Sequence, residues 1–283
     1  MKSVFSKLIN VRGQLLDLAA PQVMGILNVT PDSFYADSRT MSEEEIARRA
    51  DEIITQGASM IDVGAYSSRP GAENISEQEE ISRLCFALRI IRERHPQAII
   101  SIDTFRSRVA DFCVQEYGAD IINDISGGSI DPQMFATVAR LGVPYILMHL
   151  KGIPQTMQQN PTYEDVVREV ILYMAERLRQ LNELGVKDVI IDPGFGFAKT
   201  LEHNYELMNA LQDFSILERP ILVGISRKSM IYKLLDGTPS DSLNGTTCLN
   251  TIALMKGANI LRVHDVREAV EVVQIVKQLT TDN

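Results

Sequence analysis

The chain has 283 residues, a formal net charge of −9 and an ordinary globular composition, with 45% hydrophobic and 23% charged residues. A negative balance disfavours nonspecific binding to nucleic acid or to an anionic membrane, because both need a basic surface. No apolar run approaches the roughly 18 residues that span a bilayer, and the beginning of the chain lacks the apolar stretch of a signal peptide. We therefore expect a cytoplasmic protein that binds neither nucleic acid nor a membrane.

The three cysteines, Cys85, Cys113 and Cys248, are widely spaced and form no Cys-x-x-Cys pair. Their odd number fits a reducing compartment and argues against a disulfide framework or structural zinc. The four histidines show no metal-ligand spacing either. We expect the thiols to be ordinary buried side chains.

In chain order, short β-branched runs alternate with amphipathic segments, which predicts parallel strands joined by crossover helices. The runs are Val23–Val29, Met60–Ala65, Ala98–Thr104, Asp120–Ile125, Val143–Leu150, Lys187–Pro193, Pro220–Ser226 and Asn259–His264. Eight such units are the number of a (β/α)₈ TIM barrel, which typically has about 250 residues. We predict one (β/α)₈ domain over residues 1–283, with the barrel proper over roughly 20–280 after a short N-terminal extension.

Helix signals fall between these runs. Ser42 with Glu45, and Ser76 with Glu79, fit capping boxes at helix starts. In the segment Tyr163–Leu184, apolar residues recur on one helical face, as expected for a helix that packs on a barrel. They are Val166, Val167, Val170, Ile171, Met174, Leu178 and Leu181.

Polar and charged residues gather where the apolar runs end. They are Asn28, Asp62, Asp103, Asn123, Asp124, His149, Asp192, Ser226, Arg227, Lys228, Arg262 and His264. In a (β/α)₈ barrel these ends meet on one face, so residues distant in sequence can share a pocket. The alternative is helix capping, to which we assign Asp62, Asp124 and Asp265.

Capping does not explain Lys228, Arg262 or His264, because a cation near a helix start opposes the helix dipole unless an anion lies between them. These three residues therefore predict a pocket for an anionic substrate. The glycine-rich stretch Asp192–Phe197 lacks the third glycine of a dinucleotide fingerprint, and the chain contains no Walker A sequence and no nucleophile elbow. A dinucleotide fold and covalent catalysis are not expected.

Three segments, Met24–Phe34, Ser68–Ala72 and Gly224–Ser229, closely resemble the dihydropteroate synthase family, and the resemblance spans all eight predicted strands. The family condenses 6-hydroxymethyl-7,8-dihydropterin diphosphate with p-aminobenzoate, which gives dihydropteroate and pyrophosphate in folate synthesis. The resemblance also implies Mg²⁺ as cofactor, a homodimer, and inhibition by sulfonamides that mimic p-aminobenzoate.

The resemblance implies a set of ligand-binding residues at the strand ends. For the pterin they are Asp103, Asn123, Met148, Asp192 and Lys228. For the diphosphate they are Asn28, Arg69, Arg262 and His264, with Asn28 also a Mg²⁺ ligand. For p-aminobenzoate they are Ser68, Arg69, Pro70, Phe197 and Ser229. We assign catalytic roles to Arg69, Lys228, Arg262 and His264.

The chemistry of these residue types agrees with the assignment. A carboxylate such as Asp192 can accept two donors from a pterin edge, an amino group and a ring N–H. Mg²⁺ needs few protein oxygens when substrate phosphates and waters complete its shell. Since the motifs contain no nucleophile-base pair, we expect C–O cleavage to precede attack by the arylamine, with electrostatic stabilisation of the departing diphosphate.

The chain departs from the family pattern in two places. Tyr66 stands where the family usually has Glu, and Asp37 lies one place later than the common loop acid. Two other functions share the pterin anchors: a methyl-transfer domain that works with a corrinoid protein, and a noncatalytic pterin-binding paralogue. The full diphosphate and p-aminobenzoate sets favour the synthase over both.

Overall fold

The computed structural model describes residues 7–30, 42–67 and 74–280. Within these ranges eight parallel strands form one sheet in the order β8-β7-β6-β5-β4-β3-β10-β9. A bridge from Ile191 in β8 to Ile221, just before β9, joins the two edges of the sheet into a barrel. The strands are β3 (Gln22–Asn28), β4 (Met60–Gly64), β5 (Ile99–Asp103), β6 (Ile121–Asp124), β7 (Tyr145–Met148), β8 (Val189–Asp192), β9 (Leu222–Val223) and β10 (Ile260–Val263). Each overlaps its predicted run, so the (β/α)₈ prediction is confirmed.

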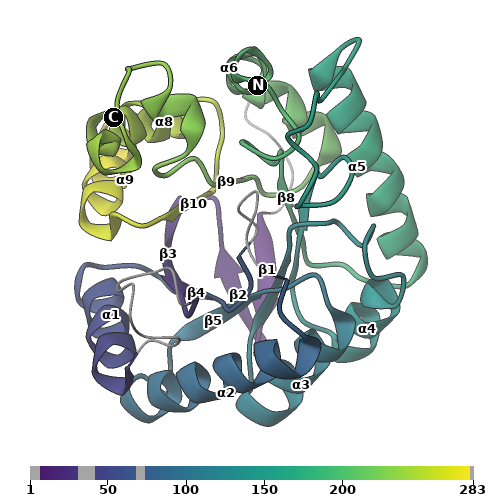
Figure 1. The fold of residues 1–283 in the computed structure, drawn as a ribbon, viewed down its shortest axis with the longest axis vertical. Coiled ribbons are helices and arrows are strands. Elements are labelled where there is room, and N and C mark those ends of the chain that lie inside the picture. Colours follow the sequence, from purple (N-terminus) through teal and green to yellow (C-terminus); the bar gives the residue numbers. More distant parts are fainter. Residues whose placement is uncertain (1–6, 31–41, 68–73, 281–283) are drawn as a thin grey trace.

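Helices surround the barrel as an outer ring (Figure 1). They are α1 (Glu43–Thr55), α2 (Glu77–Arg94), α3 (Ser107–Tyr117), α4 (Met134–Leu141), α5 (Val166–Glu183), α6 (Leu201–Asn209), α7 (Ser229–Tyr232), α8 (Leu243–Met255) and α9 (Val266–Thr280), with 3₁₀ turns η2 (Leu211–Leu217) and η3 (Pro239–Asp241). Ser42 and Glu45 form the predicted capping box of α1, whereas Ser76 accepts from the Glu79 amide without the reciprocal bond. The apolar stripe predicted for α5 is buried at Val166 and four further positions along the helix.

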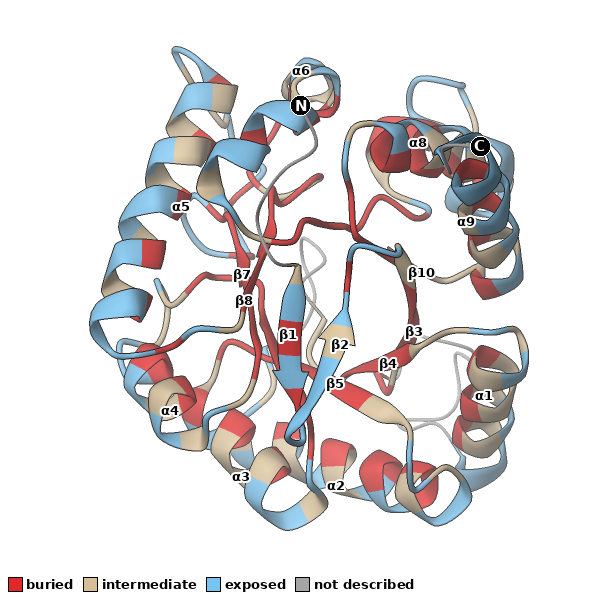
Figure 2. Cartoon of the chain, turned by 180° about the vertical axis from the view of Figure 1, so that it is seen from behind, coloured by how far each residue is buried: buried red, intermediate tan, exposed pale blue. Residues whose placement is uncertain are grey.

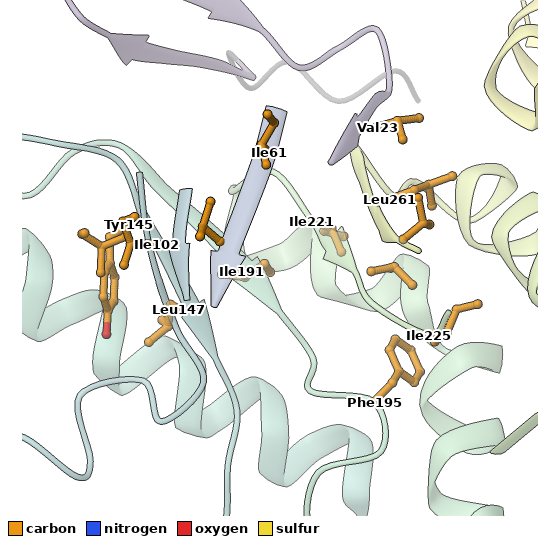
Figure 3. Close-up of a cluster of buried hydrophobic side chains, with 14 of the residues drawn as sticks. Val23, Ile61, Ile102, Tyr145, Leu147, Ile191, Phe195, Ile221, Ile225 and Leu261 are labelled. Carbon is orange, nitrogen blue, oxygen red and sulfur yellow. The ribbon is translucent and has the colours of Figure 1, made fainter. Parts of the chain in front are cut away.

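Side-chain alternation along the strands separates the core into two layers. Residues that point outward pack under the helices, among them Ile61, Ile102 and Ile191 (Figure 3). Residues that point inward at the amino ends fill the barrel with apolar side chains, including Met24 and Met60. Burying one such side chain contributes about 1.5–3 kcal/mol. The inward positions nearer the carboxyl ends are polar, and they form the site.

A hairpin of β1 (Leu8–Val11) and β2 (Gln14–Asp17) lies across the amino end of the barrel (Figure 2). Its Ile9 packs with Met24 and Met60 in the barrel interior. Arg12 donates from Nη2 to Asp120 at 2.7 Å. No strands were predicted from the sequence for this N-terminal extension. Because the hairpin covers the amino end, ligands reach the interior from the carboxyl end.

Candidate active site

Arg262 lies at the centre of the polar layer. From β10 its Nε donates to Asp62 of β4 at 2.6 Å, and its Nη2 donates to Asp103 of β5 at 2.6 Å. Burial alone would lower the pKa of Arg262, but the carboxylates of Asp62 and Asp103 raise it above its usual value. The prediction that only a bound anion offsets this cation is therefore wrong, because two carboxylates already do so. The assignment of Asp62 to helix capping is also wrong, because its side chain faces the barrel interior.

The other two residues assigned to capping behave differently. Asp124 accepts from the backbone N–H groups of Ser126 at 2.7 Å and Gly128 at 2.8 Å, so it caps the turn that follows β6. Asp265, next to the start of α9, instead binds the Arg227 guanidinium, with 3.0 Å between Nε and Oδ2. Asp124 thus caps a turn and not the helix that we expected, since α4 begins only at Met134, and Asp265 forms an ion pair.

Asn123 and Asp192 belong to the same inward layer as Arg262. The Nδ2 of Asn123 donates to both oxygens of Asp62, at 3.2 and 3.3 Å. Oδ1 of Asp192 accepts from the backbone N–H of Gly194 at 2.8 Å. Burial raises the pKa of Asp192, and nearby Lys228 and Arg262 oppose this shift.

Asp192 and Arg262 lie close to the same glycine, Gly224. A Cβ built on Gly224 would lie 4.0 Å from Oδ2 of Asp192 and 3.9 Å from Cδ of Arg262, both at van der Waals contact. The structure thus brings the predicted pterin anchor and one predicted diphosphate binder together just after β9.

Lys228, in the loop after β9, lies near Asp192 and Arg262. Its Nζ donates to the carbonyl oxygen of Phe195 at 2.6 Å and lies 4.6 Å from the ring centre of Phe197. Burial, and then the charge of Arg262, lower the pKa of Lys228 to about 8, although Asp192 acts in the opposite direction. Ser229 follows directly as the first residue of α7. Three residues predicted for the two substrate rings, Lys228, Phe197 and Ser229, are thus neighbours.

His264 follows β10 and bonds to the loop after β9. Its Nδ1 and its backbone N lie 3.1 Å from Oγ of Ser226. Burial, and then the charges of Arg262 and Arg227, lower the pKa of His264 to about 3. The expectation of a cation at His264 is therefore wrong for the ligand-free protein, in which the imidazole is neutral.

The apolar wall of the mouth is a cluster around Met148. Met148 packs with Phe105 and Ile125, and Tyr66 and Phe197 adjoin them. Tyr66 meets Phe105 edge to face at 5.0 Å. Its hydroxyl accepts from Nε2 of Gln155 at 2.7 Å, a residue after β7. Tyr66, whose role the sequence left open, thus joins this wall.

Asn28 ends β3 opposite Gly64 of β4. A Cβ on Gly64 would lie 3.4 Å from Oδ1 of Asn28 and 3.3 Å from Cβ of Asp103. Asn28 and Asp103 carry side-chain oxygens of the kind that Mg²⁺ binds, and both lie beside Gly64, which has no side chain. In the described ranges, no group of three or more His, Cys, Asp or Glu side chains is arranged to hold a metal.

Lys199 is a site residue that the sequence analysis missed. It is 3% exposed, and its Nζ donates to the carbonyl oxygens of Gly194 at 2.9 Å and Phe197 at 3.0 Å. The available signal was a lysine directly after a glycine-rich apolar turn. Ser68, Arg69, Pro70 and Asp37 lie outside the described residues.

These features define a (β/α)₈-barrel protein. At the carboxyl ends of its strands, the basic side chains of Lys199, Lys228 and Arg262 lie near buried carboxylates. Across the described ranges, every helix is too short or too polar to span a bilayer. A family model described as "Pterin binding enzyme" matches residues 24–264.

Known proteins extend this match over nearly the whole chain. The dihydropteroate synthase of Escherichia coli K12 is 43% identical over 268 residues, which cover 94% of each chain. A Yersinia pestis dihydropteroate synthase, solved as a complex with a sulfonamide drug, superposes with a TM-score of 0.91 at 38% identity, covering 97% of this chain and 100% of that one. The Xanthomonas albilineans enzyme, solved with 4-aminobenzoic acid, gives 0.89 at 32% identity, covering 98% and 100%. The chain belongs to the pterin-binding enzyme family and, within it, to the dihydropteroate synthases.

Proposed function

We propose that this chain condenses 6-hydroxymethyl-7,8-dihydropterin diphosphate with p-aminobenzoate to give 7,8-dihydropteroate and pyrophosphate. The observation that carries the proposal is the placement of Asp192 and Arg262 beside the same residue, Gly224, with Lys228 near Asp192. A carboxylate suits the amino and ring N–H donors of the pterin, and a guanidinium suits phosphate oxygens. The carboxyl end of the barrel therefore offers both kinds of partner close together.

The pterin end of the substrate binds in the inward layer. Asp192 accepts the donor pair, while Asn123, held through its Nδ2 by Asp62, offers its Oδ1 as an acceptor. Met148 packs against the ring, and Lys228 donates to the ring carbonyl oxygen. Asp103, already bonded to Arg262, borders the same ring.

The diphosphate end binds toward Arg262 and His264. The bonds from Arg262 to Asp62 and Asp103 use Nε and Nη2, so the Nη1 donors remain for the phosphate oxygens. A neutral His264 contributes a hydrogen bond instead of a charge. Arg69 stays a predicted partner. Asn28 would supply an oxygen ligand to Mg²⁺, and the bound ion would neutralise negative charge on the departing diphosphate.

The reaction proceeds by cleavage of the C–O bond before the amine attacks. The bonding electrons leave with the diphosphate oxygen, and the cation that remains is stabilised by the pterin ring. The neutral amine of p-aminobenzoate then forms the C–N bond and loses one proton. Preorganised donors such as Arg262 act on the charge that develops at the leaving oxygen, so the reaction needs no strong base.

The p-aminobenzoate ring binds against Phe197, beside Lys228 and the start of α7. The backbone at Ser229 holds its carboxylate, and Ser68 and Pro70 complete the predicted set. A sulfonamide mimics the same arylamine. We therefore expect competitive inhibition against p-aminobenzoate, and a noncompetitive pattern would contradict this placement.

A homodimer is proposed through the outer surface of α8 and α9, which pack on each other. These helices carry large exposed apolar side chains, among them Met255 at 57% and Ile275 at 62% exposure. Exposed apolar patches of this kind commonly mark protein interfaces. Light scattering should give a dimer mass for the wild type and a smaller mass for Met255→Glu.

The proposal is tested by assaying pyrophosphate release with both substrates and Mg²⁺, and then omitting each in turn. Release that needs all three supports the synthase. A noncatalytic pterin-binding paralogue would bind the pterin without release. A methyl-transfer domain would bind it and require a corrinoid partner.

A further inference from the structure

Lys199 is buried, and all of its donors are in use. It lies in the loop between β8 and α6, and its Nζ lies 2.9 Å from the carbonyl oxygen of Gly194, 3.0 Å from that of Phe197 and 3.0 Å from Nδ1 of His149. An ammonium group has three donors, so each donor has an acceptor. The ammonium group thus ties two points of its own loop to the end of β7.

The two carbonyl groups belong to loop residues that contact two different parts of the proposed site. Gly194 donates its N–H to the carboxylate of Asp192 at 2.8 Å. Phe197 carries the ring that faces the Lys228 ammonium. Through these two residues Lys199 is connected to the pterin anchor and to the wall of the p-aminobenzoate pocket.

The loop has little freedom to adopt another shape. Gly194 has a φ of 74°, and a Cβ there would lie 2.2 Å from the carbonyl oxygen of His149. The backbone N of Phe197 also donates to the Gly194 carbonyl oxygen at 3.1 Å. That oxygen therefore accepts from both Lys199 and Phe197. Removing the ammonium would leave the Phe197 carbonyl oxygen and the His149 imidazole without this donor.

Placing an ammonium group here costs free energy, because burial disfavours the charged form. Burial lowers the pKa of Lys199 to about 7, and the carboxylate of Asp192 offsets part of this shift. A methionine of similar length would avoid the desolvation cost. The hydrogen bonds to the Gly194 and Phe197 carbonyl oxygens explain why a lysine stands at this buried position.

We propose that Lys199 is a positioning residue that holds the backbone between Asp192 and Phe197, so that the pterin anchor and the p-aminobenzoate wall keep their relative placement. The proposal rests on the proposed function for the identity of the two substrates. It adds a residue that touches neither substrate and acts on both.

The first test compares Lys199→Met with Lys256→Met. Lys256 also donates to a backbone carbonyl oxygen, that of Asn209 at 2.7 Å, but it precedes β10 at the amino end of the barrel. Lys199→Met should raise KM for p-aminobenzoate and the Kd of the dihydropterin by roughly tenfold, the effect of losing about one hydrogen bond to a charged group. Lys256→Met should change neither. Wild-type values for a folded Lys199→Met protein would overturn the proposal.

A double-mutant cycle with Phe197→Ala separates positioning from general stabilisation. If Lys199 acts on p-aminobenzoate through Phe197, adding Lys199→Met to Phe197→Ala should raise KM by less than about threefold. Independent effects that multiply in full would contradict the proposal. Circular dichroism and urea unfolding show whether each variant is folded.

His149 provides a second route if Lys199→Met does not fold. His149→Leu removes one acceptor of the ammonium, whereas His149→Asn keeps a polar atom near the position of Nδ1. We expect His149→Leu to raise both KM for p-aminobenzoate and the Kd of the dihydropterin, and His149→Asn to bring both values most of the way back to those of the wild type. Equal effects of the two changes would overturn the proposal. If wild-type protein binds the dihydropterin but releases no pyrophosphate, the proposed function fails, and the Kd of the dihydropterin still tests Lys199.

Discussion

Arg262 of β10 reaches Asp62 of β4 inside the barrel, with 2.6 Å between Nε and Oδ2. Asp62 is fully buried, and Arg262 is 17% exposed. The ion pair holds the Arg262 guanidinium in place, and in the proposed reaction this guanidinium binds the leaving diphosphate. We therefore expect Asp62 to contribute to stability and, through Arg262, to the proposed reaction.

Replacing Asp62 by Ala should reduce the free energy of unfolding by about 3–5 kcal/mol, because it leaves a buried guanidinium short of one carboxylate. Urea unfolding monitored by circular dichroism measures this change. The surface pair Arg267–Glu271 provides a control, since both side chains are more than half exposed. Glu271→Ala should cost less than about 1 kcal/mol. Similar losses for the two variants would contradict the structural role of Asp62.

Replacing Arg262 by Ala should lower turnover by ~10²-fold or more, by analogy with the loss of one preorganised donor at a developing oxyanion. It also leaves Asp62 and Asp103 to repel the diphosphate. Steady-state kinetics with saturating p-aminobenzoate measure the effect. Arg262→Lys should recover part of the rate by restoring the charge without the planar fork. Unchanged kinetics for Arg262→Ala would remove this residue from the mechanism.

The pKa of Lys228, lowered to about 8, predicts a decline of kcat/KM at alkaline pH. The protonated form donates to the pterin carbonyl oxygen, and this form is lost as pH rises through about 8. Above that point kcat/KM should fall about tenfold per pH unit. In Lys228→Arg, the guanidinium keeps its proton, so the decline should move to higher pH while the maximum rate is lower. The same decline in both proteins would assign it to another group.

The barrel follows from sequence patterns with simple physical causes. Buried parallel strands need apolar residues on both faces, so the runs before Asn28, Asp103 and Asp192 are visible without coordinates. The individual roles at the site came from the family resemblance, which assigned Lys228 and Phe197 to the binding of the two substrates. In the structure the Lys228 ammonium lies 4.6 Å from the centre of the Phe197 ring.

Other features depend on partners that are distant in sequence. An aspartate at the end of a strand is typical of a helix cap, and only the partners of Asp62, Asn123 and Arg262, show that it faces inward. The charge state of His264 depends on its burial and on the nearby charges of Arg262 and Arg227. The local sequence does not reveal these neighbours. Lys199 lies in an apolar loop, where its acceptors are backbone carbonyls with no side-chain signature.

The hairpin at the amino end should stabilise the fold without affecting the reaction. Arg12 is 38% exposed, and its partner Asp120 also binds Arg92 at 3.1 Å and the Ile100 amide at 2.8 Å. Arg12→Ala should therefore lower the free energy of unfolding by about 1 kcal/mol. Both KM values should stay at their wild-type levels. A change in KM for either substrate would link the amino end to the site.

In the proposed site, Asp192 binds the heterocycle while Arg262, beside the same glycine, binds the diphosphate. The most direct test compares the Kd of 6-hydroxymethyl-7,8-dihydropterin with that of its diphosphate in Asp192→Asn and Arg262→Ala. Asp192→Asn should weaken both ligands by the same factor, whereas Arg262→Ala should weaken the diphosphate at least about tenfold more than the alcohol. Equal losses for the two ligands in Arg262→Ala, or unchanged binding in Asp192→Asn, would contradict the claim.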